Sequence, residues 1–151
     1  MGIEKDIQQA KFRNVYQKAG INLIYTLGWV KERTRPIFDE EDITPQQFNI
    51  LRILRGSHPQ PLSTLQIRER MLEKMSDTSR IVDRLISKGL VKKITCKTDR
   101  RLVDVIISEK GKKLLERLDA KQDEIDGVLR NLTEKEAATL SELLDKIRNR
   151  E

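Results

Sequence analysis

Residues 62–107 contain two helical patterns followed by two short β patterns. The β patterns, at residues 90–95 and 102–107, are short runs rich in Val and Ile that flank a polar tip at residues 96–101. A helix pair followed by a hairpin with arginines at its tip lets a compact domain fill one groove of DNA and reach into the next. This order of elements, more than any single residue, indicates a DNA-binding domain.

The two helical patterns have clear start and stop signals. Ser63 and Gln66 have the spacing of a capping box, which predicts a short helix to about Leu72. A turn follows, and the second helix is predicted over residues 74–87. Gly89 then supplies the left-handed residue that commonly ends a helix.

Helices are also predicted before this segment. Residues 4–34 form one predicted helix, which Pro36 should end because proline cannot continue the hydrogen-bond ladder. Residues 38–43 are predicted to be an acidic loop. Thr44 and Gln47 form a second capping box and open another helix. The apolar stripe of the first helix consists of Ile7, Val15, Ala19, Leu23, Leu27 and Val30.

Two helices are predicted after the hairpin. Ser108 should cap a long helix that continues to about Leu129, and Thr133 should cap a last helix. The predicted fold class is therefore mainly α with a small β hairpin (α+β). The helices at both chain ends carry more apolar surface than one small domain can cover. Two copies that pack their terminal helices together would bury it.

Composition excludes several classes of function. One Cys and one His in 151 residues rule out a disulfide, a Cys-X-X-Cys metal site and a histidine-rich metal site. We find no glycine-rich phosphate loop or paired-carboxylate motif, so we expect no enzyme, no cofactor and no metal. No apolar run approaches the roughly 20 residues that span a bilayer. The chain begins with charged residues instead of a secretory signal, and we expect a cytoplasmic protein.

Positive charge is concentrated around the hairpin. The whole chain has 30 Lys and Arg against 24 Asp and Glu, a formal net charge of +6. Such an excess alone decides nothing, but its local concentration suits a polyphosphate partner. The basic residues between positions 88 and 101 are Lys88, Lys92, Lys93, Lys97, Arg100 and Arg101, opposed only by Asp99.

The second helix of the pair has two distinct faces. Thr78, Val82, Leu85 and Ile86 form the face that should pack inward; Ser76, Ser79, Arg80, Asp83 and Arg84 form the outer face. Arginine suits bidentate contact with guanine or with phosphate. For Arg80 the alternative to DNA contact is an ion pair with Asp77 or Asp83. For Arg84 the alternatives are the same kind of ion pair and a contact that locks the helix to the hairpin.

The hairpin tip is the sharper signal. We predict that Arg101 enters the minor groove, that Arg100 contacts phosphate and that Asp99 braces one guanidinium. Lys97 and Thr98 belong to the same candidate surface. The alternative is that these charges only keep the protein soluble.

Four segments in register resemble the multiple antibiotic resistance regulator (MarR) family. They contain Thr44-Pro45-Gln46-Gln47, Val82-Asp83-Arg84-Leu85 with Gly89-Leu90-Val91, Asp99-Arg100-Arg101, and Ile107-Ser108 with Gly111. The resemblance covers residues 43–111. It implies a winged helix-turn-helix homodimer that binds a pseudo-palindromic operator, usually as a repressor. It also implies the following division: residues 1–36 for dimerisation, 37–108 for DNA binding and 109–151 for dimerisation.

The resemblance implies further roles. Many relatives release DNA when they bind a small ligand, and Tyr16, Trp29 and Phe48 are the candidates to line such a site unless these rings are simply core. Oxidation of Cys96 could disturb the wing, or Cys96 could be an inert thiol. Met75 departs from the family's usual turn, and we expect it to fill the core instead of contacting DNA. A competing hypothesis is a winged-helix module that binds a protein, which Asp77 and Asp83 would permit.

Overall fold

The computed structural model describes residues 2–95 and 103–149. Packing divides the chain into two compact units. The terminal unit consists of Met1–Pro36 and Val128–Glu151, and the central unit consists of Ile37–Gly127.

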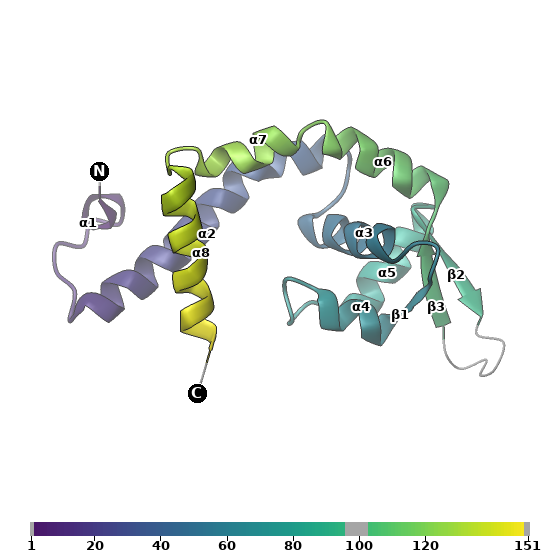
Figure 1. Ribbon diagram of the computed structural model, residues 1–151, viewed down its shortest axis with the longest axis horizontal. Coiled ribbons are helices and arrows are strands. Elements are labelled where there is room, and N and C mark those ends of the chain that lie inside the picture. The colour runs from purple at the N-terminus through teal and green to yellow at the C-terminus, as the bar shows by residue number, and fades with distance from the viewer. Residues whose placement is uncertain (1, 96–102, 150–151) are drawn as a thin grey trace. The chain divides into compact units, whose positions relative to one another are not determined.

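The central unit combines helices with a three-stranded antiparallel sheet (Figure 1). The strand order is β1-β3-β2, with Val91 opposite Ile107 and Thr95 opposite Val103. Helices and a small hairpin are the predicted fold class, which is confirmed. Its elements are α3 (Pro45–Ser57), β1 (Leu62–Ser63), α4 (Thr64–Arg70), α5 (Thr78–Ser87), β2 (Val91–Thr95), β3 (Val103–Ile107), α6 (Glu109–Asp119) and α7 (Gln122–Asp126).

Side-chain caps fix where these helices begin. The Thr44 hydroxyl accepts a hydrogen bond from the Gln47 N–H (3.1 Å), and the Gln47 side chain accepts one from the Thr44 N–H (3.1 Å). Ser63 and Gln66 form the same reciprocal pair at α4. Ser108 caps α6 through the Gly111 N–H. All three predicted caps are confirmed, and each satisfies backbone donors that a helix start leaves unpaired.

The core of the central unit joins α3, α5, the sheet and α6. Leu114, Leu115 and Leu118 of α6 are buried in the same cluster as Leu51 and Leu85. The expected division of the chain assigns residues 109–151 to dimerisation within a single compact chain, and that assignment stays a prediction. Helix α6 belongs to the central unit because its apolar stripe covers that unit's core.

The predicted long helix over residues 109–129 is interrupted after Asp119. The Lys121 N–H bonds the Leu118 carbonyl three residues back (3.0 Å), which tightens the last turn. The Lys121 ammonium pairs with Glu40. Helix α7 follows, then a single 3-10 turn, η1 (Gly127–Leu129).

An ion pair links α3 to α6 and gives a pH-dependent prediction. The Arg55 guanidinium donates two hydrogen bonds to Asp119 (2.6 and 3.0 Å), and they hold the pKa of the Asp119 carboxyl below its usual value. A carboxylate with a lowered folded-state pKa stabilises the fold above its unfolded pKa, about 3.9, and loses that effect as pH falls through the folded pKa.

We therefore expect Asp119→Asn to lower the free energy of unfolding at pH 7 by up to about 1 kcal/mol, because the pair is partly exposed. The difference from the wild-type protein should narrow as pH falls below about 4. Urea unfolding of both proteins at pH 7, 4 and 3 measures it. An equal difference at all three pH values would contradict the assignment.

The terminal unit contains α1 (Ile3–Asp6), most of α2 (Val15–Asp39), and α8 (Glu134–Arg148), which Thr133 caps as predicted. The single helix predicted over residues 4–34 is wrong, because the helix stops after Asp6 and α2 starts at Val15. Asn14 Oδ1 accepts the Gln17 N–H (2.9 Å), an N-cap geometry that starts α2 afresh.

Helix α2 also passes through Pro36 instead of ending there, so that prediction is wrong too. The reason lies in the next two residues. Ile37 and Phe38 are 8% and 5% exposed and belong to the core of the central unit, so residue 38 is not in an acidic loop. Burial of two such side chains contributes about 3–6 kcal/mol. A proline inside a helix costs about 3 kcal/mol, which this burial offsets.

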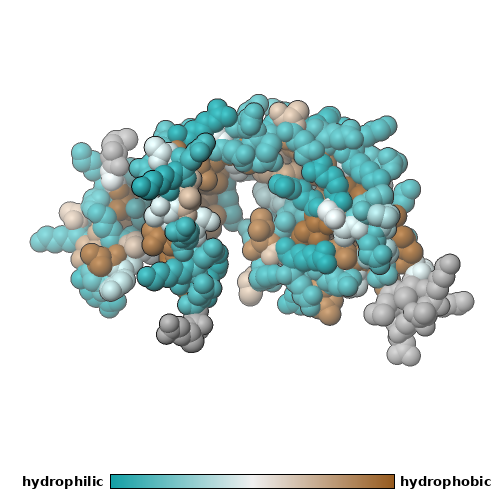
Figure 2. Space-filling model, in the orientation of Figure 1, coloured by the Kyte–Doolittle hydropathy of each residue, from teal (hydrophilic) through white to brown (hydrophobic). Residues whose placement is uncertain are grey.

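Apolar side chains lie exposed along the two long helices of the terminal unit. Figure 2 shows hydrophobic residues at the surface of this part of the chain. The exposed apolar residues of α2 and α8 are Val15, Tyr16, Leu23, Ile24, Tyr25, Leu27, Leu140, Leu143 and Ile147. Within residues 2–95 and 103–149, no helix combines the length and apolar character needed to cross a membrane.

Candidate nucleic-acid interface

Helix α5 is held in place through its inner face. Thr78, Val82 and Leu85 are buried, and the helix packs against α3, α4 and β2. Asp77 caps the helix, because its carboxylate accepts the Arg80 N–H (3.2 Å). The helix ends as predicted at Gly89, whose φ of 71° lies in the left-handed region. The predicted inner face is therefore confirmed.

The start of this helix was predicted four residues too early. Residues 74–77 form a turn, and α5 begins at Thr78. Ser76 thus precedes the helix and is half-buried, while the other members of the predicted outer face are exposed: Ser79, Arg80, Asp83 and Arg84. Asp77 was missed as a cap, although an Asp directly before the first buried residue of a helix is a recognised signal.

The charged residues of α5 differ in whether they form ion pairs within the chain. Asp83 lies 3.8 Å from the Lys93 ammonium and so connects α5 to β2. That link to the hairpin is made by Asp83 and not by Arg84. Among the residues that the structure describes, no carboxylate forms an ion pair with the Arg80 or Arg84 guanidinium. Two cations without a described carboxylate partner, on the same exposed helix face as the Ser79 hydroxyl, suit an anionic partner.

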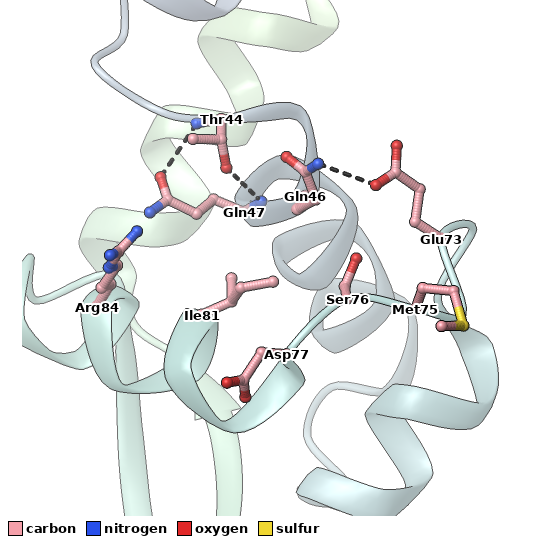
Figure 3. A pocket seen from close by; sticks show the side chains of 9 residues that line it. All are labelled: Thr44, Gln46, Gln47, Glu73, Met75, Ser76, Asp77, Ile81 and Arg84. Atoms are coloured by element: carbon pink, nitrogen blue, oxygen red, sulfur yellow. Dashed lines mark hydrogen bonds between the residues drawn. The ribbon is translucent and has the colours of Figure 1, made fainter.

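A shallow polar pocket of about 370 Å³ lies beside this helix, between the start of α3 and the turn before α5 (Figure 3). Arg84 and Met75 stand at opposite ends of it. Gln46 donates a hydrogen bond to Glu73 across one side of the pocket (3.0 Å). The other lining residues are Thr44, Gln47, Ser76, Asp77 and Ile81.

Met75 is not part of the core. Its side chain is 98% exposed, so the expectation that it fills the core is wrong. The later helix start explains the difference, since it places residue 75 in the turn instead of on an inward-facing helical position. Met71 occupies the buried position instead.

The tip of the hairpin lies outside the described residues. Strands β2 and β3 approach it with Thr95 opposite Val103, and Lys92 and Lys93 are exposed on β2. The predictions for the tip concern Cys96, Lys97, Thr98, Asp99, Arg100 and Arg101, all of which fall outside the described residues.

The three rings predicted to line a ligand site have different surroundings. Phe48 packs against Phe38 with ring centroids 5.1 Å apart, within the central unit. Tyr16 and Trp29 both lie on α2, thirteen residues apart in sequence. That separation is about 20 Å along a helix, so one small molecule cannot contact both rings in the same chain. The Arg33 guanidinium lies 4.6 Å from the centre of the Trp29 ring.

Comparison with known proteins agrees with this arrangement. Residues 43–103 match the sequence model of the MarR family. YpoP of Bacillus subtilis (strain 168), an uncharacterized HTH-type transcriptional regulator, is 30% identical over 120 residues, which cover 78% of this chain and 82% of YpoP.

Solved structures show the same likeness. A MarR transcription factor from Planctomyces limnophilus is 33% identical and has a TM-score of 0.68, over 91% of this chain and 98% of that one. BpsR of Bordetella bronchiseptica has a TM-score of 0.81 at 18% identity, over 93% and 100% of the two chains. With both the sequence and the fold in agreement, this chain belongs to the MarR family of DNA-binding transcriptional regulators, which are not enzymes.

Proposed function

We propose that this regulator acts as a homodimeric repressor, which binds a pseudo-palindromic operator and blocks transcription there. The observation that carries the proposal is the outer face of α5. Ser79, Arg80 and Arg84 are exposed there, and neither guanidinium is paired with a described carboxylate. The inner face of α5 is buried and its N-terminus is capped by Asp77, so the helix can enter a major groove as a rigid element.

Dimerisation is supported by the exposed apolar faces of α2 and α8. On α8, Leu140, Leu143 and Ile147 are three and four residues apart and so share one face. A second copy of the chain would cover such a stripe. Two copies would also present two α5 helices, as two half-sites about one helical turn apart require.

The wing supplies the second part of the proposed contact. In the sequence, Arg100 and Arg101 lie three and two residues before the first residue of β3, whose partner β2 carries Lys92 and Lys93. We propose that Arg101 binds in the minor groove, that Arg100, Lys97 and Thr98 contact the backbone, and that Asp99 orients an arginine. Ser76 stands beside α5 and completes the proposed set.

Release by a small molecule is the third part of the proposal. BpsR is a protein whose DNA binding is regulated by 6-hydroxynicotinic acid, and its fold supports the same kind of control here. Trp29 with the adjacent Arg33 offers a ring and a cation for an acidic aromatic ligand. Tyr16 is too far from Trp29 of the same chain to share such a site with it. Phe48 is half-buried and packs against the core of the central unit.

Selection of bound duplexes from a random pool tests the proposal. Two half-sites with centres about 10 base pairs apart are expected. The affinity should fall with salt, at about 0.9 in the log–log slope for each phosphate contact. The protein-binding alternative relied on Asp77 and Asp83, whose carboxylates have partners within the chain. Absence of binding to any duplex at low salt would overturn the proposed function.

Removal of one wing arginine gives a sharper prediction. We expect Arg101→Ala to weaken operator binding about tenfold or more, because a well-placed arginine contact contributes about 1–3 kcal/mol. The thermal midpoint should not change. Fluorescence anisotropy measures the affinity, and Lys113→Ala on α6 is the charge-matched control. Normal operator binding by Arg101→Ala would refute the wing assignment.

A further inference from the structure

The turn between α4 and α5, residues 72–76, is fastened on both sides. The Leu72 N–H donates a hydrogen bond to Asn49 Oδ1 of α3 (2.9 Å), and Gln46 of α3 donates one to the Glu73 carboxylate (3.0 Å). On the other side the Lys74 ammonium donates to the Glu69 carbonyl at the end of α4. The turn is therefore a defined part of the surface and not a loose connection.

This fastened turn presents Met75 almost completely to solvent, with 98% of it exposed. A single exposed apolar side chain is common and by itself carries no meaning. Here its place matters. Met75 lies two residues before the Asp77 cap of α5, at the end of the helix that also presents Ser79 and Arg80. The N-terminal end of such a helix is the part that reaches base edges in a major groove.

An apolar side chain in a major groove has one apolar group of the bases to contact. The bases present hydrogen-bond donors and acceptors there, with one apolar group, the 5-methyl group of thymine. Methionine is unbranched and polarisable, so its side chain can adapt its conformation and pack closely against a methyl group. Because the turn is already fixed, little backbone entropy is lost on contact.

We propose that Met75 contacts the 5-methyl group of one thymine in each operator half-site and is a base-selecting residue of this regulator. The inference rests on the proposed DNA-binding function and adds a direct apolar contact to it. A protein partner at this surface is the competing occupant. Lys74, Ser79 and Arg80 are exposed on this turn and on the first turn of α5, and they favour the nucleic acid. The two carboxylates nearest to Met75 in sequence are already engaged, Glu73 by the Gln46 amide and Asp77 by the Arg80 N–H.

Replacement of thymine by deoxyuridine tests the proposal, since only the methyl group is removed. Each thymine of a selected operator half-site is replaced in turn in both half-sites. At one symmetric position we expect the wild-type affinity to fall about fourfold per half-site, the value of one buried methyl group. Met75→Ala should bind the thymine operator more weakly by a similar factor and should be insensitive to deoxyuridine at that position.

Leu72→Ala is the matched control, because Leu72 is an equally apolar, exposed residue of the same turn. It should keep the full response to deoxyuridine. Duplex binding in which wild type and Met75→Ala respond equally at every thymine overturns the inference and leaves the proposed function intact. Failure of the wild-type protein to bind any duplex overturns the proposed function and the inference together.

Discussion

The Gly111→Ala protein is expected to lose about 3 kcal/mol or more of folding free energy, a large share of the stability of a domain of this size. A Cβ at position 111 would lie 2.3 Å from the Leu90 carbonyl oxygen and 2.8 Å from Ile107 Cγ1. The first of these is a backbone atom at the start of the hairpin. The gain from alanine in a helix, about 1 kcal/mol, is too small to compensate.

Chemical denaturation followed by circular dichroism measures this loss. Gly56→Ala is the control, because its added Cβ in helix α3 would meet no other part of the described chain within 4 Å beyond the helix's own backbone and the adjacent residues. That protein should be unchanged or more stable by up to about 1 kcal/mol. If Gly111→Ala were as stable as Gly56→Ala, the result would contradict the close packing of α6 at Gly111 against Leu90 and Ile107.

The second large effect is expected in the terminal unit. A Leu143→Glu, Ile147→Glu protein should sediment as a single chain and bind the operator at least 100-fold more weakly. An unpaired carboxylate is strongly disfavoured in an apolar interface. Both side chains are exposed within one chain, so the protomer itself should fold normally.

Sedimentation velocity measures the loss of the dimer, and operator titration of the same preparation measures the loss of DNA affinity. Ala138→Glu is the matched control, because residue 138 lies on the opposite side of α8 from this stripe. It should leave both the mass and the affinity unchanged. A double variant that still sediments as a dimer would show that α8 does not form the interface.

Local signals were sufficient for much of the fold. Thr44, Ser63, Ser108 and Thr133 each begin a helix as predicted, because a capping side chain interacts only with the next three residues. Pro36 was misleading because its cost is offset by Ile37 and Phe38, whose burial depends on the core of the central unit. That compensation is tertiary, and no local rule contains it.

The candidate site also has one part that follows from local sequence and one part that depends on tertiary contacts. The exposure of Ser79, Arg80 and Arg84 follows from helical periodicity and was predicted. The place of Met75 depends on hydrogen bonds to α3 from residues separated by 23 and 27 positions in sequence. Sequence spacing carries no signal for contacts of that kind, so the turn was assigned to the helix and Met75 to the core.

Apart from Asp83, which faces outward and pairs with Lys93 of β2, the side chains that anchor α5 and those that face outward are separate sets. Thr78, Val82, Leu85 and the Asp77 cap hold the helix, and none of them belongs to the outward row. Over evolutionary time, the positions of Ser79, Arg80 and Arg84 can therefore accept new side chains with little effect on the stability of the domain. One scaffold of this kind can diverge to recognise many different promoters.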